Sequence, residues 1–309
     1  MGSRILRLPS CSDGASLTPA MKKFLVNLAV GIVAAIGLSS CIQSHTVVSV
    51  NKDGTATIEE KTVMSGMIAQ MLQGFAGAFE GKDGEKPPGA GTNPLLDKAS
   101  YEKRAKEMGE GVVLKEVKEL KDAKGGIGVH AVFTVADINK LKLTSTGGDV
   151  PEALKGLSPD VEELKGEEVT PITFGFKDGE LSINVPQPEH ADEIAKSNEE
   201  LEGLEPELNL GPEQAQQLEM TKLMMQDMAI SLKVRIVDGI AKTDAAHRVD
   251  SDITLFEIKF SEVLKDPNAF SKLVLIGEDV KDKNKAMAVL KKLPGITLEP
   301  KEKVSVTLK

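Results

Sequence analysis

The sequence has no tryptophan, one tyrosine (Tyr101) and two cysteines, Cys11 and Cys41. With no cysteine after Cys41, the rest of the chain cannot form disulfides between its own residues, thiolate metal sites or a cysteine nucleophile. The shortage of large aromatic rings also disfavours stacking platforms for bases or sugars. The stability of a long chain of this kind must come from ordinary core burial.

The chain also lacks an excess of basic residues, since its net charge is −9. Residues 1–40 carry four basic side chains and one acidic one, so the remainder carries −12. Nucleic acid is therefore excluded as a partner, since its phosphates require clustered Lys and Arg. An acidic chain is also weakly repelled from anionic lipid headgroups.

The longest apolar run begins after a second methionine, in "MKKFLVNLAVGIVAAIGLSSC". Lys22 and Lys23 precede fifteen mostly apolar residues, which are fewer than the roughly 20 that a membrane span needs. A basic start, a short apolar run and small residues before Cys41 predict a secretory signal peptide over 21–40. We interpret residues 1–20 as a disordered start-site extension, with translation beginning at Met21.

The segment Leu38-Ser39-Ser40-Cys41 resembles the lipobox of bacterial lipoproteins. The resemblance implies that the Cys41 thiol receives diacylglycerol, that the peptide is cut before Cys41, and that the new amine is acylated, for example with palmitate. It implies a mature region over 41–309 in the cell envelope, facing the periplasm or the exterior. Ile42 replaces the Asp that retains many such proteins at the inner membrane, so the outer membrane is favoured. The alternatives are a soluble secreted chain and an uncut signal anchor.

The sequence of the mature region predicts an α+β fold, in which mostly antiparallel β-hairpins pack with several amphipathic helices. Hairpins are indicated where strand-forming residues flank a Gly-containing turn, as at Asn51–Gly54, Asp178–Gly179 and Asp238–Gly239. Expected helices cover 64–79, 94–108, 212–228 and 279–292, with short ones capped by Asp137 and Ser261. Polar composition predicts a flexible loop near 81–93 and an acidic linker near 186–211.

Three longer segments, "VSVNKDGTATIEE", "GIGVHAVFTVADINKLKL" and "VRIVDGIAKTDAAHRVDSDITLFEI", resemble a group of uncharacterised bacterial lipoproteins. The first and last hairpins are also distantly similar to LppM-type lipoproteins. That resemblance implies a β-rich, lipid-binding kind of domain and brings no catalytic residues.

Motifs for catalysis or metal binding are weak. His45, His130 and His247 stand alone, and His190 lies in the acidic stretch "PEHADE", where a solvated role outweighs cation binding. Two Ser-x-x-Lys pairs, Ser49/Lys52 and Ser100/Lys103, match a penicillin-interacting pattern without its partner motifs. We expect no cofactor, no metal and no enzymatic activity.

Methionine is concentrated in two expected helices, where it fills irregular cores or lines adaptable binding surfaces. Core packing is the favoured interpretation, and the alternative is an apolar ligand surface formed by Met64, Met67, Met71, Met220, Met224 and Met228. The sequence thus predicts a membrane-anchored, non-catalytic binding or structural module whose partners are the membrane and a lipid or an envelope protein. The alternatives are a carrier of lipid or another apolar ligand, and a hydrolase without a recognisable motif.

Overall fold

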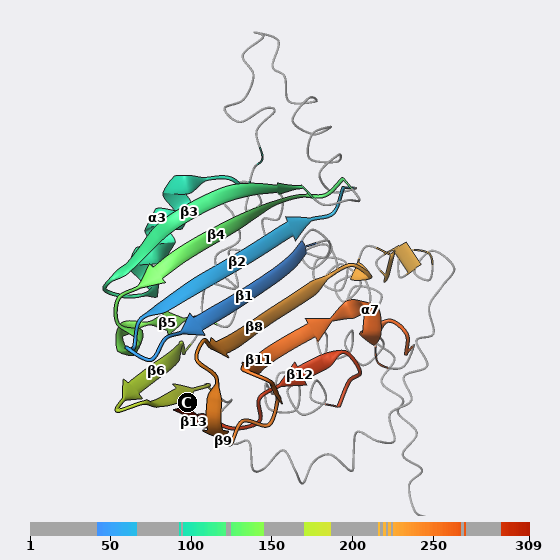
Figure 1. Cartoon of the computed structure of the whole chain (residues 1–309). Helices are drawn as coiled ribbons and strands as arrows, with labels where there is room; N and C mark the ends of the chain where they lie inside the picture. Colours follow the sequence, from blue (N-terminus) through green and yellow to red (C-terminus); the bar gives the residue numbers. More distant parts are fainter. Residues whose placement is uncertain are drawn as a thin grey trace, which may run out of the picture.

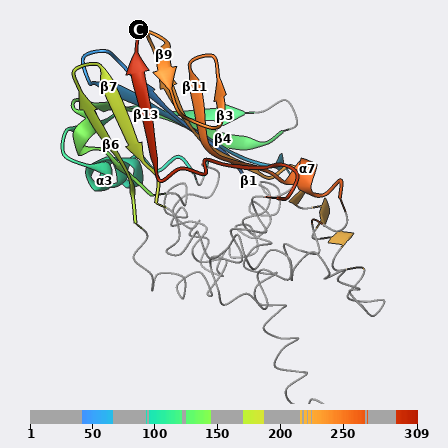
Figure 2. The same cartoon turned by 90° about the horizontal axis from the view of Figure 1, so that it is seen from below.

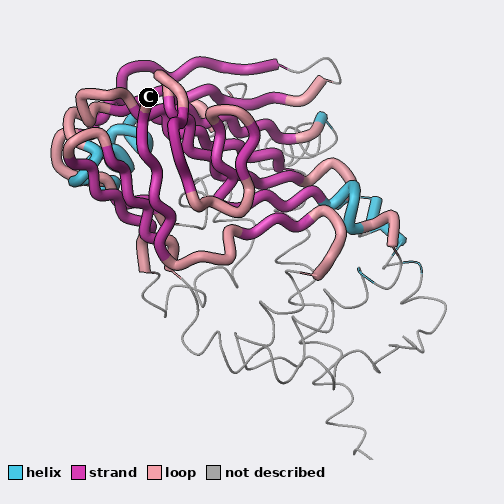
Figure 3. Tube along the Cα trace, turned by 60° about the horizontal axis from the view of Figure 1, so that its bottom comes forward, coloured by secondary structure: helices cyan, strands magenta, loops and turns pink. Residues whose placement is uncertain are grey.

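Strands account for most of the chain that the computed structural model describes (Figures 1 and 3). The described residues are 42–66, 93, 95–121, 125–144, 170–186, 216, 219–220, 222–223, 225–266, 269 and 292–309. The signal peptide, the start-site extension, most of the expected loop near 81–93 and most of the acidic linker lie outside these residues. Their predicted boundaries therefore stay predictions.

The larger sheet has eight strands, seven of which follow the order β10-β11-β8-β1-β2-β4-β3. The eighth, β12, pairs with the same edge of β11 as β10 does. Its strands are β1 (Ile42–Val50), β2 (Ala56–Met64), β3 (Val112–Lys121), β4 (Ile127–Val135), β8 (Ala229–Ile236), β10 (Arg248–Val249), β11 (Asp252–Lys259) and β12 (Ile296–Leu298). The described pairs are antiparallel except β1 with β8, which run parallel in a register that places Gln43 opposite Ala229 and Val50 opposite Ile236. The first strand therefore lies in the interior of the sheet.

The smaller sheet has five strands in the order β5-β6-β7-β13-β9, all paired antiparallel. They are β5 (Lys142–Leu143), β6 (Ile172–Lys177), β7 (Glu180–Asn184), β9 (Ile240–Thr243) and β13 (Lys303–Leu308). The chain passes from the larger to the smaller sheet after β4, after β8 and after β12. Figure 2 shows β6, β7 and β13 on one side of the larger sheet.

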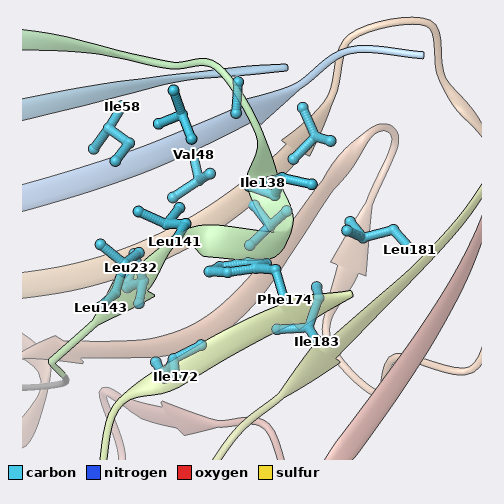
Figure 4. Packing of buried hydrophobic residues seen from close by; sticks show 14 of the residues in the cluster. Val48, Ile58, Ile138, Leu141, Leu143, Ile172, Phe174, Leu181, Ile183 and Leu232 are labelled. Atoms are coloured by element: carbon cyan, nitrogen blue, oxygen red, sulfur yellow. The ribbon is translucent and has the colours of Figure 1, made fainter. Parts of the chain in front are cut away.

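The core lies between the two sheets because period-two alternation turns one face of each strand inward. In the larger sheet the inward positions include Val48, Ile58 and Phe133, all fully buried. They form one cluster with residues of the smaller sheet, among them Ile172, Phe174, Leu181 and Ile183 (Figure 4). The 3-10 helix η1 (Ile138–Lys140) and Leu141 fill the space where the chain crosses between the sheets.

The expected α+β class with several amphipathic helices is wrong, because the described chain is mostly β. Its helices with defined bounds are α3 (Lys98–Met108), the four-residue α7 (Phe260–Val263) and η1. The helix α3 is highly charged and buries only Ala105 and Met108, so it covers the sheet without building a core of its own. The core is built by burial between the two sheets. The expected helix over 64–79 is wrong at its start, because Met64 ends β2, and its residues 67–79 lie outside the described residues, as do residues 279–291 of the expected helix over 279–292.

Helix starts also differ from the expected ones. Asp97 caps α3 by accepting a hydrogen bond from Ala99 N, whereas Asn93 accepts from Leu95 N in a preceding turn. Asp137 caps η1 as predicted, with its carboxylate accepting from Asn139 N. For α7 the cap position is Lys259, and Ser261 lies inside the helix. Local capping chemistry thus identified turns correctly but misplaced two helix starts.

Turn chemistry was the more reliable signal. Gly54 has a φ of +82° at the β1–β2 turn, and its Cα lies against the Phe176 ring of the smaller sheet. A Cβ there would be 2.9 Å from that ring. Asp178 and Gly179 both have positive φ, as a two-residue hairpin turn requires. Gly54, the β8–β9 turn at Val237–Gly239 and η1 meet at one end of the larger sheet, which we call the hairpin end.

The opposite end of the larger sheet is defined by Ile42, Met64, Ile127, Ala229 and Lys259, and we call it the Ile42 end. Register connects these residues directly: Met64 pairs with Ile42 and Ile127, and Ala229 pairs with Gln43 and Lys259. Strands β1 and β8 therefore both begin at this end.

Replacing Phe133 by Ala should lower the free energy of unfolding by about 4 kcal/mol, because the ring is fully buried between the sheets. Val113→Ala, on the neighbouring strand β3, is the matched control, and its exposed side chain predicts a change within about 0.5 kcal/mol. Urea denaturation of both variants measures the difference. Equal effects would contradict the assignment of the core.

Candidate functional site

The predicted anchor lies next to the start of β1. Cys41 and the lipobox residues Leu38, Ser39 and Ser40 fall outside the described residues, so their chemistry stays a prediction. Ile42, the next residue, is already paired with Met64, and Gln43 is paired on both sides, with Val63 and Ala229. No linker separates the predicted lipid attachment site from the interior of the larger sheet.

The methionines do not form one described surface. Met64 is fully buried at the end of β2, Met225 is buried, Met228 is half-buried, and Met220 is exposed. Met67, Met71 and Met224 lie outside the described residues. Met64 and Met225 thus lie in the interior, Met64 on a strand and not in the expected helix, while Met220 faces solvent.

A buried ion pair connects α3 to the larger sheet. Arg104 Nη1 on α3 lies 2.7 Å from Glu60 Oε2 on β2, and the Glu60 side chain is almost fully buried. Its other oxygen, Oε1, is buried without a hydrogen-bond partner among the described residues. Burial raises the pKa of Glu60, because the loss of hydration outweighs the attraction of Arg104.

Tyr101 borders this pair from the same helix. Its ring packs against Phe133, with ring centroids 6.4 Å apart. Burial, helped by the Glu60 carboxylate, raises the pKa of Tyr101 to about 12. The phenol therefore stays neutral, and the Glu60–Arg104–Tyr101 cluster acts to fix α3 in place.

Sequence reasoning missed this cluster, although the signal was present. Ala56 and Ile58 point inward on β2, and Glu60 is the next residue in the same period-two series. Glu59, its neighbour, lies on the opposite face of the sheet. A carboxylate in phase with the core residues predicts a buried partner, and the basic residues of α3 were the candidates.

A second polar group spans the face of the larger sheet opposite the core. Cross-strand register aligns one residue from each of six neighbouring strands in a row, which we call the outer-face row: Lys118, His130, Lys61, His45, Ser231 and Glu257. His45 Nδ1 lies 2.8 Å from Ser231 Oγ, and Glu257 forms ion pairs with Lys233 and Lys259. The row could not be found from the sequence, because its members are scattered from residue 45 to residue 257.

Burial is the main cause that lowers the pKa of His45. The nearby carboxylate of Glu257 opposes the shift, and the ammonium groups of Lys233, Lys259 and Lys61 add to it. Near pH 7 the neutral imidazole is favoured, which suits a hydrogen bond with the Ser231 hydroxyl.

The remaining candidates for chemistry have other neighbours, and His130 Nε2 has no hydrogen-bond partner among the described residues. His130 Nε2 lies 3.7 Å from Glu59 Oε2, and His247 Nε2 lies 3.1 Å from the carbonyl oxygen of Leu298. Ser100 Oγ donates to Asp97 in the α3 cap, and Lys103 pairs with Glu107. In the other Ser-x-x-Lys pair, Ser49 is a strand residue on β1 and Lys52 lies in the exposed β1–β2 turn. His190 lies outside the described residues.

No group of three or more His, Cys, Asp or Glu side chains converges on a metal position within the described ranges. In the same ranges, no helix combines the length and apolar character required to cross a bilayer. Neither observation extends to the rest of the chain.

No protein-family model and no curated protein sequence matches the chain. Among solved structures, the fold is weakly similar to the NMR structure of the folded domain of LppM from Mycobacterium tuberculosis. The sequences are 11% identical, the TM-score is 0.28, and the alignment covers 72% of this chain and 84% of that one. A TM-score this low carries no argument about fold or function.

Replacing Arg104 by Met should reduce the free energy of unfolding by roughly 3 kcal/mol, because it leaves the Glu60 carboxyl buried without its partner. Lys103→Met, one residue earlier and exposed, is the matched control and should change it by about 0.5 kcal/mol or less. A double variant, Glu60→Leu with Arg104→Met, should recover most of the loss. Urea denaturation measures all three, and failure of the double variant to recover stability would contradict the buried-pair assignment.

Replacing His45 by Gln should make stability less sensitive to pH on the acidic side of neutrality. A depressed folded-state pKa means that the unfolded chain binds the proton more readily. The stability contributed by neutral His45 is therefore complete above its unfolded pKa of about 6.5 and is lost as pH falls through the lowered folded value. Denaturation midpoints between pH 8 and pH 5 test this, and a constant difference between parent and variant would refute it.

Proposed function

We propose that the chain is a lipoprotein of the bacterial envelope, in which Cys41 carries the lipid and residues 42–309 form a non-catalytic binding or structural module. The single observation that carries the proposal is the position of the lipobox. Leu38-Ser39-Ser40-Cys41 ends one residue before β1 begins, so the predicted cleavage point coincides with the start of the described fold.

Attachment by acyl chains suits the physical character of the chain. Its acidic charge disfavours electrostatic binding to anionic lipids, so hydrophobic insertion has to supply the attachment. One acyl chain binds a bilayer only marginally, whereas two or more hold it firmly. Diacylglycerol on the thiol and a further acyl chain on the amine would satisfy that requirement.

A non-catalytic role is supported by where the candidate catalytic side chains lie. Ser100 and Lys103 have separate structural partners, and the described histidines have different neighbours: the Ser231 hydroxyl, the Glu59 carboxylate and the Leu298 carbonyl. Glu60, whose pKa is raised by burial, is paired with Arg104 on α3. By the lipobox resemblance, Ile42 after the anchor favours the outer membrane, and density-gradient separation of the two membranes would test that part.

The Cys41→Ser variant should lose the mass of the diacylglycerol and acyl groups and should no longer fractionate with membranes as a processed protein. The reason is that the thiol is the attachment atom and no other cysteine follows it. Intact-mass analysis of the native protein, combined with membrane fractionation, measures both effects.

Cys11→Ser is the matched control, since Cys11 precedes Met21 and would be absent from the processed chain. It should leave mass and fractionation unchanged. If the Cys41→Ser protein is processed and remains with membranes as the parent does, the proposed function is wrong.

A further inference from the structure

The absence of a linker at the anchor restricts how the domain can sit on a membrane. Cys41 directly precedes Ile42, the first paired residue of β1. The Cα atoms of consecutive residues are only about 3.8 Å apart. Gln43 is held from both sides by β2 and β8. A lipid on Cys41 would therefore be attached almost directly to an interior strand of a rigid sheet.

Parallel pairing places a second segment at the same end. Because β8 runs parallel to β1, the residues that lead into β8 approach it from the Ile42 end. They are helical at Glu219, Met220, Lys222, Leu223 and Met225. We call these five residues, together with 226–228, the approach segment.

Contacts with the sheet hold the approach segment in position. Met225 is buried, and Met228 O accepts a hydrogen bond of 3.1 Å from Phe260 N, just beyond the end of β11. Gln226 N donates to Lys222 O at 3.0 Å, which continues the helical turn. The segment is thus fixed to the end of the sheet where the anchor lies.

Two apolar side chains of the segment are exposed. Met220 is 61% exposed and Leu223 is 57% exposed, and their spacing of three residues places them on one side of a helix. Beside them, Lys222 Nζ lies 2.8 Å from Glu219 Oε1, so these two charges compensate each other. Exposed apolar side chains next to a compensated charge pair suit the interfacial layer of a bilayer.

We propose that the Ile42 end of the larger sheet faces the bilayer and that Met220 and Leu223 insert into its interfacial layer beside the Cys41 lipid. The inference rests on the proposed lipid anchor and adds an orientation and a second contact. The strands then point away from the membrane, and the hairpin end with Gly54 is the part most distant from it.

Comparably exposed apolar residues at the far end provide matched controls. Val237 is 54% exposed in the β8–β9 turn, and Val249 is 72% exposed on β10 next to the β11 start. Both lie at the hairpin end, where Ile236 pairs with Val50. Their exposure is similar to that of Met220 and Leu223, so only their position differs.

The test introduces one cysteine at a time, as Met220→Cys, Leu223→Cys, Val237→Cys or Val249→Cys, in the full chain. In the processed lipoprotein the introduced thiol is the free one, because Cys41 is acylated and Cys11 is removed. Each purified lipidated variant is labelled with a fluorophore and reconstituted in phosphatidylcholine vesicles. Quenching is then measured with a headgroup-linked lipid quencher and with aqueous iodide.

Labels at 220 and 223 should be quenched by the lipid quencher at least about twofold more than labels at 237 and 249, and less by iodide. Equal quenching at the four positions, in chains that carry acyl groups by mass and sediment with the vesicles, would overturn this inference and leave the anchor intact. Chains that lack acyl groups and fail to sediment would instead overturn the proposed function. The labels at 220 and 223 could also lose their protection from iodide as the protein-to-lipid ratio is lowered. That result would show that a second copy covers the segment, and it also overturns the inference.

Discussion

The pairing of β1 with both β2 and β8 is the constraint on which the rest of the larger sheet depends. Antiparallel contact with β2 follows from a short hairpin, whereas parallel contact with β8 joins residues such as His45 and Ser231 that are 186 positions apart. Without the second contact, β8, β11, β10 and β12 would have no strand pairing with the β1–β2–β4–β3 half. The smaller sheet depends on it as well, because two of its crossings start from β8 and β12.

Charge placement follows from the same sheet. Its inner face is apolar except near α3, where Glu60 requires Arg104, and its outer face carries the His45–Ser231 contact and the Glu257 ion pairs. The buried pair costs hydration and is stabilising only as an intact unit. It therefore specifies where α3 lies more than it adds to stability, and the exposed charges of the outer face serve mainly to keep that face hydrated.

Turns could be predicted from the sequence, but long-range pairing could not. Asn51–Gly54, Asp178–Gly179 and Asp238–Gly239 are local signals with a steric basis, and the structure confirms each of them. Helical periodicity led to the wrong fold class because it does not tell whether helices or a second sheet cover the first one. Distant residues meet in the β1–β8 register, in the outer-face row and in the Glu60–Arg104 pair. Of these three, only the buried position of Glu60 was indicated by the sequence, through the alternation on β2. Of the predicted site, Cys41 rests on a local motif alone.

Strand β8 follows β1 by almost 180 residues in the sequence, and this order affects how the chain folds. Synthesis delivers β1 well before residues 229–236, so one edge of an interior strand stays unpaired until β8 is available. Open strand edges invite pairing with other chains, and widely separated contacts form slowly. The incomplete chain thus passes through an interval in which a chaperone would protect it from aggregation, and this interval ends when β8 pairs with β1.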